Sequence, residues 1–191
     1  MIEKGDREKV KSRIRAAFAP TPYPGDWCLR GSSEGEEPYL LEKEFKGKED
    51  WQSLGAEFLD QAPDGYGSAL SFFSDEAFHF YLPAYLMADM DGLLSLTSPS
   101  FHLTHGLRDA DRRQPVNPAR YGERTWYDQA CFRFSMFNRE EAAAIVAYLE
   151  LKRELDEFER PGIDQALKNY WYGRVKDPET GPPADTMGAD R

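Results

Sequence analysis

The chain has 191 residues, and its 34 acidic and 24 basic side chains give a formal net charge of -10 at pH 7. This length predicts one domain, and the acidic balance argues against nucleic acid and anionic membranes as partners, because both are bound largely through cationic side chains. The two cysteines, Cys28 and Cys131, lie far apart in the sequence, which is not the pattern of a disulfide framework or a zinc finger.

The ends of the chain and its hydropathy bear on location. The first residues are charged and lack the apolar run of a signal peptide, and no segment approaches the ~20 apolar residues that span a bilayer. We therefore expect a cytoplasmic protein that does not enter a membrane.

The N-terminal third predicts two helices. Asp6 can cap a helix over residues 7–18, which must end before the prolines that begin at Pro20. Residues 39–45 fit either a strand or a turn of helix. A second helix is predicted over residues 50–61, and a turn over residues 63–67.

Residues 69–90 hold the densest run of large apolar side chains and are predicted to form the centre of the core. Ser74 is suited to cap a helix in which apolar residues recur at three- and four-residue spacing. Pro83 has no amide hydrogen to donate. We therefore expect a break or kink near Tyr81–Leu82, followed by a second short helix to about Met90.

The same stretch carries a resemblance. It contains Glu-Ala-Phe-His-Phe-Tyr-Leu-Pro-Ala-Tyr-Leu, and Trp51 and Leu54 form a Trp-x-x-Leu pair upstream. These residues resemble the core signature Phe-x-x-Glu-Ala-Phe-x-Tyr-Tyr-Leu-Pro-Ala-Tyr-Leu of a family of uncharacterised, mostly bacterial proteins, a domain of unknown function. The resemblance covers about residues 45–90. It implies a shared fold unit and brings no catalytic residue with it.

The region after the central stretch is harder to interpret. Residues 98–124 have little periodicity, and a loop of this length in a compact domain is expected to be functional or disordered. Phe132, Phe134 and Met136 alternate with polar residues, which favours a strand over residues 125–137, although a helix that begins near Trp126 remains open.

The C-terminal third has the clearest start signal. Asn138 to Glu141 form a capping-box pattern that opens a helix over residues 139–159, with an apolar stripe that ends in Leu155 and Phe158. A short helix is predicted near residues 163–172. Residues 176–191 are polar and rich in proline and glycine, so we expect a disordered tail.

Together these elements predict one mainly α-helical domain over residues 6–175, built around a proline-kinked central helix. The alternative is an α+β domain with one or two short strands. The helices at 50–61 and 139–159 are expected to close over the central element.

Candidate metal ligands are few. His102 and His105, with Asp109 close in sequence, are the nearest approach to a metal site, but zinc needs three or four ligands and this set is incomplete. We therefore predict no metal and no cofactor. Glu76 and His79 are three residues apart and could face each other as an acid–base pair.

A local positive patch stands out in the acidic chain. Arg108, Arg112 and Arg113, together with the aromatic Trp126, are candidates for contact with an anion or a partner. No catalytic residue is predicted.

Two functional hypotheses follow. The first is a non-enzymatic interaction protein whose partner is another protein, for example an acidic immunity-type inhibitor that binds a basic protein by charge complementarity. The alternative is a small metal-dependent hydrolase that uses His102, His105 and nearby aspartates. The sequence predicts neither the partner nor the oligomeric state.

Overall fold

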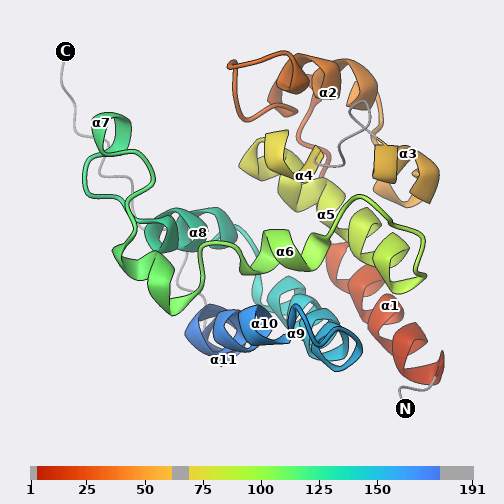
Figure 1. Ribbon diagram of the computed structural model, residues 1–191. Helices are drawn as coiled ribbons and strands as arrows, with labels where there is room; N and C mark the ends of the chain where they lie inside the picture. Colours follow the sequence, from red (N-terminus) through yellow and green to blue (C-terminus); the bar gives the residue numbers. More distant parts are fainter. Residues whose placement is uncertain (1–3, 62–68, 177–191) are drawn as a thin grey trace.

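The computed structural model describes residues 4–61 and 69–176, and Figure 1 shows the arrangement of their helices. In chain order the elements are α1 (Lys4–Phe18), η1 (Asp26–Cys28), α2 (Glu37–Phe45), η2 (Trp51–Ser53), α3 (Ala56–Gln61), α4 (Ala69–Phe72), α5 (Asp75–Met90), α6 (Pro99–Thr104), η3 (Asp109–Arg113), α7 (Pro118–Tyr121), α8 (Trp126–Phe134), α9 (Arg139–Leu155), α10 (Arg160–Ala166), the π-helical turn η4 (Leu167–Trp171) and α11 (Tyr172–Lys176). The mainly α prediction is confirmed. Within the described ranges, β pairing is limited to two isolated antiparallel bridges, Arg30 with Phe73 and Pro115 with Thr125, so the alternative with short strands is not observed.

The central helix α5 begins where the sequence predicts. The Ser74 hydroxyl accepts a hydrogen bond from the amide of Ala77 at 3.0 Å, which satisfies a free donor of the first turn. Phe78, Leu82 and Leu86 are all fully buried, and this confirms that the helix forms the centre of the core.

Of the break or kink predicted near Tyr81–Leu82, the break with a second short helix is wrong, because α5 is one helix from Asp75 to Met90. The kink stays a prediction. The helix continues through Pro83, which is itself buried together with most of the residues around it. A proline inside a helix removes one backbone hydrogen bond, but burial of a large apolar side chain stabilises the fold by ~1.5–3 kcal/mol. Several such side chains on α5 hold the helix continuous across the lost bond.

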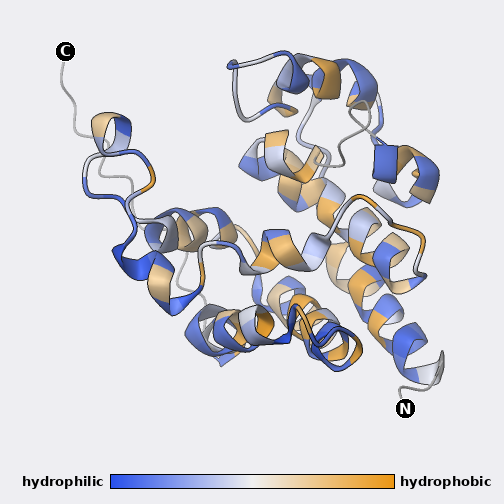
Figure 2. Cartoon of the chain, in the orientation of Figure 1, coloured by the Kyte–Doolittle hydropathy of each residue, from blue (hydrophilic) through white to orange (hydrophobic). Residues whose placement is uncertain are grey.

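The first and ninth helices lie together against the core. Helix α1 packs on both α9 and α5, and α6 lies between the α2–α5 region and the α8–α11 region (Figure 1). Side-chain bonds join α9 to α5, because the Tyr148 hydroxyl donates to Asp89 at 2.7 Å and the Lys152 ammonium donates to the same carboxylate at 2.9 Å. In Figure 2, the segment that carries η3 is largely hydrophilic, in contrast to the apolar inner faces of these helices.

Two N-terminal predictions are resolved. Residues 39–45, left open between strand and helix, belong to α2. The predicted helix over residues 50–61 is instead two elements, η2 and α3, because the chain turns extended at Leu54 before Gly55. The turn predicted over residues 63–67 lies outside the described residues.

The strand favoured over residues 125–137 is wrong, and the helical alternative is correct. Thr125 caps α8: its hydroxyl accepts from the Asp128 amide at 3.1 Å, and the Asp128 carboxylate accepts from the Thr125 amide at 2.9 Å. This reciprocal capping box satisfies two donors and starts the helix, even though the apolar residues further along alternate.

The predicted start of α9 is confirmed and its predicted end is too late. The capping box of Asn138 and Glu141 is present, but the helix ends at Leu155. Asp156 then accepts from the backbone amides of Phe158 and Glu159, which turns the chain into α10. Leu155 and Phe158 therefore leave the predicted apolar stripe and are 48% and 94% exposed.

The chain after α9 forms α10, η4 and α11, so the short helix predicted near residues 163–172 is part of a longer helical run. Residue 176 ends α11, and the rest of the predicted tail lies outside the described residues. Among the helices of the described residues, none has the length and apolar character needed to cross a membrane.

Candidate functional site

A cleft of about 570 Å³ opens between the first turn of α5 and one face of α8. We call it the α5–α8 cleft. Its lining residues come from six short segments: Arg30, Gly31, Ser32, Ser71, Phe73, Ser74, Asp75, His102, His105, Val116, Tyr121, Trp126, Gln129, Ala130, Arg133 and Phe134. The volume lies in the ~300–1,000 Å³ range of small-molecule sites.

The segment 30–32 forms one wall because it packs against the residues that precede α5. The Gly31 amide donates to the Phe72 carbonyl at 2.7 Å. A Cβ atom at Gly31 would stand 2.6 Å from the Phe73 carbonyl oxygen, so only glycine allows this approach.

Helix α8 forms the opposite wall. Trp126, Gln129, Ala130 and Arg133 line the cleft, and their three-, one- and three-residue spacing places them on one helical face. The end of α6 meets this face at Gly106, whose φ of +83° is readily adopted only by glycine.

The two histidines of the predicted metal pattern both line the cleft. Burial, together with the nearby charge of Arg133, lowers the pKa of His102 to about 4. Burial also lowers the pKa of His105, against an opposing effect of Asp111. Both imidazoles are therefore neutral at pH 7, and each offers one hydrogen-bond donor and one acceptor.

Aromatic contacts hold His105 at the rim. Its ring centroid lies 5.0 Å from that of Trp126 and 5.3 Å from that of Phe101. Tyr121 on α7 also lines the cleft and is 43% exposed. The rim of the cleft therefore presents several aromatic faces to solvent.

Arg133 carries the positive charge deepest in the cleft. Its guanidinium lies 3.9 Å from the centroid of the Phe78 ring, and one Nη donates to the Leu70 carbonyl at 3.2 Å. Its Nε is 3.2 Å from the Asp75 carboxylate, which is close enough for an ion pair, yet this buried Nε has no hydrogen-bond partner.

Asp75 is the one acidic side chain in the lining. Burial raises its pKa, and the charge of Arg133 acts in the opposite direction. The second guanidinium of the lining, that of Arg30, donates to Glu42 at 2.7 Å. The lining itself thus has two positive side chains and one negative side chain, in a chain whose overall charge is strongly negative.

The predicted positive patch is not brought together at this site. Of its four members only Trp126 lines the cleft. Arg112 lies over the Tyr127 ring, 3.7 Å from its centroid. Arg108 and Arg113 belong to the hydrophilic η3 segment, outside the lining.

Asp109 does not join the histidines. Its backbone amide donates to Gln165 of α10 at 3.0 Å, and its carboxylate accepts from the Asn169 side chain of η4 at 2.9 Å, so it faces α10 and η4. In the part of the chain that the structure describes, no three His, Cys, Asp or Glu side chains are grouped in a way that could hold a metal ion.

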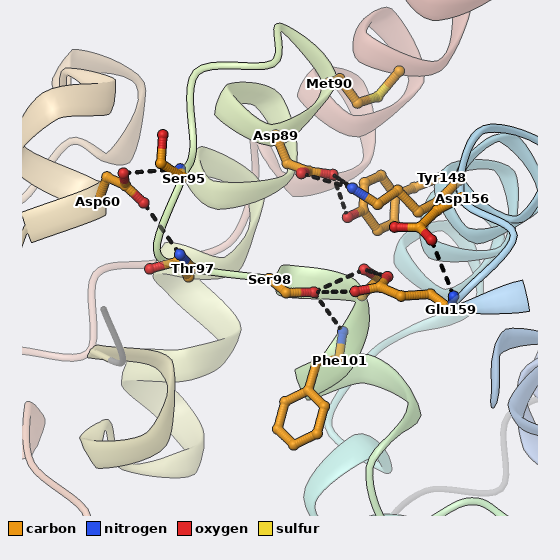
Figure 3. Close-up of polar contacts among 12 residues, drawn as sticks. Asp60, Asp89, Met90, Ser95, Thr97, Ser98, Phe101, Tyr148, Asp156 and Glu159 are labelled. Atoms are coloured by element: carbon orange, nitrogen blue, oxygen red, sulfur yellow. Dashed lines mark hydrogen bonds and ion pairs between the residues drawn. The ribbon is translucent and has the colours of Figure 1, made fainter. Parts of the chain in front are cut away.

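The predicted pair of Glu76 and His79 is not formed, and several other carboxylates have partners outside the cleft. His79 does not face Glu76 as an acid–base pair; its Nε2 lies 2.9 Å from Glu141. Figure 3 shows Asp89 bonded to Tyr148, and Glu159 bonded to Ser98 at 2.8 Å. These bonds tie α5 to α9 and the start of α6 to the start of α10, and their residues do not line the cleft.

Four residues of the lining were not predicted as site residues from the sequence: Arg30, Asp75, Gln129 and Arg133. The spacing of Trp126, Gln129 and Arg133 was a helical signal, and the Thr125-x-x-Asp128 pattern marked the start of that helix. The alternation of Phe132 with Phe134 obscured both. Nothing in the sequence placed Arg30 beside them.

A match to a protein family shows to which family this chain belongs. Residues 6–175 match the family of unknown function DUF6714. The chain belongs to this family. The match spans the predicted domain, so the DUF6714 region includes every residue that lines the cleft. No curated protein and no solved structure matches the chain.

Proposed function

We propose that this protein is a non-enzymatic binding protein and that the α5–α8 cleft is its binding site. The observation that carries the proposal is the convergence of aromatic side chains, neutral imidazoles and guanidinium groups from distant segments on one cleft of about 570 Å³. A concave site with apolar walls and a few convergent polar groups is the usual form of a binding pocket.

The polar groups in the cleft favour binding over catalysis. The Ser74 hydroxyl is used structurally, because it donates to the Cys28 carbonyl and accepts from the amide of Ala77. A general base works best with a pKa near the working pH, whereas the pKa of His102 is about 4. A metal-dependent reaction would need at least one more ligand beside His102 and His105.

The hypothesis of an acidic inhibitor that binds a basic protein stays a prediction about another surface. It rests on the net charge of -10, whereas the cleft presents the guanidinium of Arg133, the other guanidinium of the lining being paired with Glu42. The cleft is therefore better suited to a ligand or partner segment that carries negative charge.

Binding of the fluorescent probe 8-anilinonaphthalene-1-sulfonate tests the proposal, because this probe is aromatic and anionic. We expect Trp126→Ala to weaken its binding by at least ~5-fold, as loss of an aromatic anchor costs more than ~1 kcal/mol. The matched control is Trp27→Ala, since Trp27 is 86% exposed and does not line the cleft. Equal effects of the two substitutions, with circular dichroism showing that both variants are folded, would contradict the proposal.

A further inference from the structure

We propose, resting on the binding role of the α5–α8 cleft, that its ligand carries one carboxylate beside an aromatic ring. The carboxylate lies at Arg133, and the ring lies at the rim formed by Trp126 and Tyr121. The ligand class is thus an aromatic acid, and the carboxylate and the ring are each assigned from different residues of the lining.

The guanidinium of Arg133 is the anchor for the carboxylate. It has five N–H donors, and the structure uses one of them in a hydrogen bond, to the Leu70 carbonyl. Its buried Nε lacks a hydrogen-bond partner although Asp75 lies 3.2 Å away. That Nε has almost no accessible surface and stays against Asp75. The side chain as a whole is 20% exposed and lines the cleft, so an incoming carboxylate would pair with the Nη N–H groups that the Leu70 bond leaves unused.

The charges around Arg133 favour a single negative charge on the ligand. Of the two guanidinium groups in the lining, that of Arg30 is already paired with Glu42. The guanidinium of Arg133, which faces Asp75, is therefore the cation available to a ligand. A phosphate with two negative charges would meet this one guanidinium and the Asp75 carboxylate beside it, whereas a carboxylate brings a single negative charge and matches the fork of one guanidinium. The first turn of α5, which also lines the cleft, adds the positive end of a 16-residue helix.

The rim provides the site for the ring. Trp126 and Tyr121 both line the cleft, and His105 contacts the Trp126 ring edge-on at a centroid distance of 5.0 Å. Their exposed faces can pack against a planar ring, and such aromatic contacts add to the free energy of area burial. His102 and His105 are neutral there, so their N–H groups can donate to the ligand without adding charge.

This ligand chemistry has two sources, a free aromatic acid or the C-terminal aromatic residue of a partner chain. Isothermal titration is carried out with phenylacetate, with N-acetyl-L-phenylalanine and with the neutral N-acetyl-L-phenylalaninamide. Comparison of acid with amide tests the need for a carboxylate, and comparison of the two acids tests which source is bound. For the full-length protein we expect an acid to bind at least ~10-fold more tightly than the amide, because a hydrogen bond to a charged group is worth at least this factor. Tighter binding of phenylacetate would identify a free acid, and tighter binding of N-acetyl-L-phenylalanine would identify a chain terminus.

Substitution of Arg133 tests the anchor. We expect Arg133→Gln to remove the preference for the acid over the amide. Arg113→Gln, which makes the same change of charge on an exposed residue outside the lining, should keep it. Because Arg133→Gln could unfold the chain, Arg133→Lys is measured as well, and we expect it to retain the charge but weaken the preference, since an ammonium lacks the planar fork.

The comparison on the unaltered protein decides the proposal without any variant. Equal binding of acid and amide, or binding of neither, would overturn the assignment of the ligand class. In either case the proposed binding role would still stand if binding of 8-anilinonaphthalene-1-sulfonate depends on Trp126. Loss of that dependence would overturn both.

Discussion

The carboxylate of Glu141 joins three parts of the chain. It accepts from the Thr21 hydroxyl at 2.7 Å and from the Asn138 amide at 2.9 Å, and it lies 2.9 Å from Nε2 of His79. The residue is only 2% exposed. The sequence predicted its bond to Asn138, because a capping box is local, but the contacts with Thr21 and His79 depend on how α1, α5 and α9 pack.

A pH dependence of stability follows from this contact. Burial alone would raise the pKa of Glu141, but the hydrogen bonds from His79, Asn138 and Thr21 outweigh it and leave the pKa below its ordinary value of 4.5. A carboxyl whose pKa is lowered on folding contributes stability above its unfolded pKa, and loses this contribution as the pH falls through the folded pKa.

We therefore expect Glu141→Gln to destabilise the protein most near neutral pH. The difference in free energy of unfolding between the two proteins should shrink as the pH falls below about 4.5, the ordinary pKa of the carboxyl. Urea denaturation at successive pH values measures this difference. Glu140→Gln, an exposed residue on the same turn, is the matched control, and a difference that does not change with pH would contradict the expectation.

At the scale of elements, the junction of α6 with α8 positions the rim of the cleft. Gly106 combines a φ of +83° with close contact: a Cβ atom there would lie 2.7 Å from the Trp126 carbonyl oxygen and 2.8 Å from the Ala130 Cβ. Both obstacles belong to α8 and cannot move without shifting that helix. The glycine therefore sets the distance between His105 and Trp126.

Comparison of two glycines separates backbone strain from steric contact. Gly92 has a similar φ of +70°, but a Cβ atom there would meet nothing within 4 Å. Both Gly→Ala substitutions incur the left-handed strain, and only Gly106→Ala also forces atoms into α8. We expect Gly106→Ala to lower the free energy of unfolding by ~1–3 kcal/mol more than Gly92→Ala, the usual cost of overpacking. Chemical denaturation measures both values, and equal losses would show that the junction can relax.

At the scale of the whole molecule, C-terminal helices hold the middle of the chain in place. The Asn169 side chain on η4 donates to the Leu107 carbonyl and to the Asp109 carboxylate, both at 2.9 Å. The Tyr127 hydroxyl donates to the Asn169 carbonyl at 2.9 Å. Residues 107–127, which carry part of the cleft, are thus held by a turn that lies 42 to 62 residues later in the sequence than the groups it bonds.

We expect Asn169→Ala to loosen this middle segment locally. Loss of the two side-chain bonds should speed amide hydrogen exchange in residues 107–117, since local opening becomes easier where few other contacts hold the chain. Exchange measured by mass spectrometry should show little change in α5. Lys168→Ala, exposed on the same turn, should leave both regions unchanged, and a uniform rise in exchange would show that Asn169 stabilises the whole fold instead.

The local parts of this structure follow from the sequence. The cap at Ser74, the start of α9 at Asn138 and the burial of Phe78 are predicted because each depends on residues within one or two helical turns. The errors come from local rules that other features override. The break expected near Tyr81–Leu82 is overridden by the burial of α5, and the strand expected over residues 125–137 is overridden by the capping box at Thr125.

The cleft was decided by the tertiary structure alone. Arg30, Asp75, His102 and Arg133 are far apart in the sequence and meet because α4–α5, α6 and α8 pack around one space. Periodicity tells which face of a helix is apolar, but not which other element covers it. The sequence by itself therefore determined a mainly helical domain with a buried central helix, and only the packing of the helices decided which polar side chains share a site.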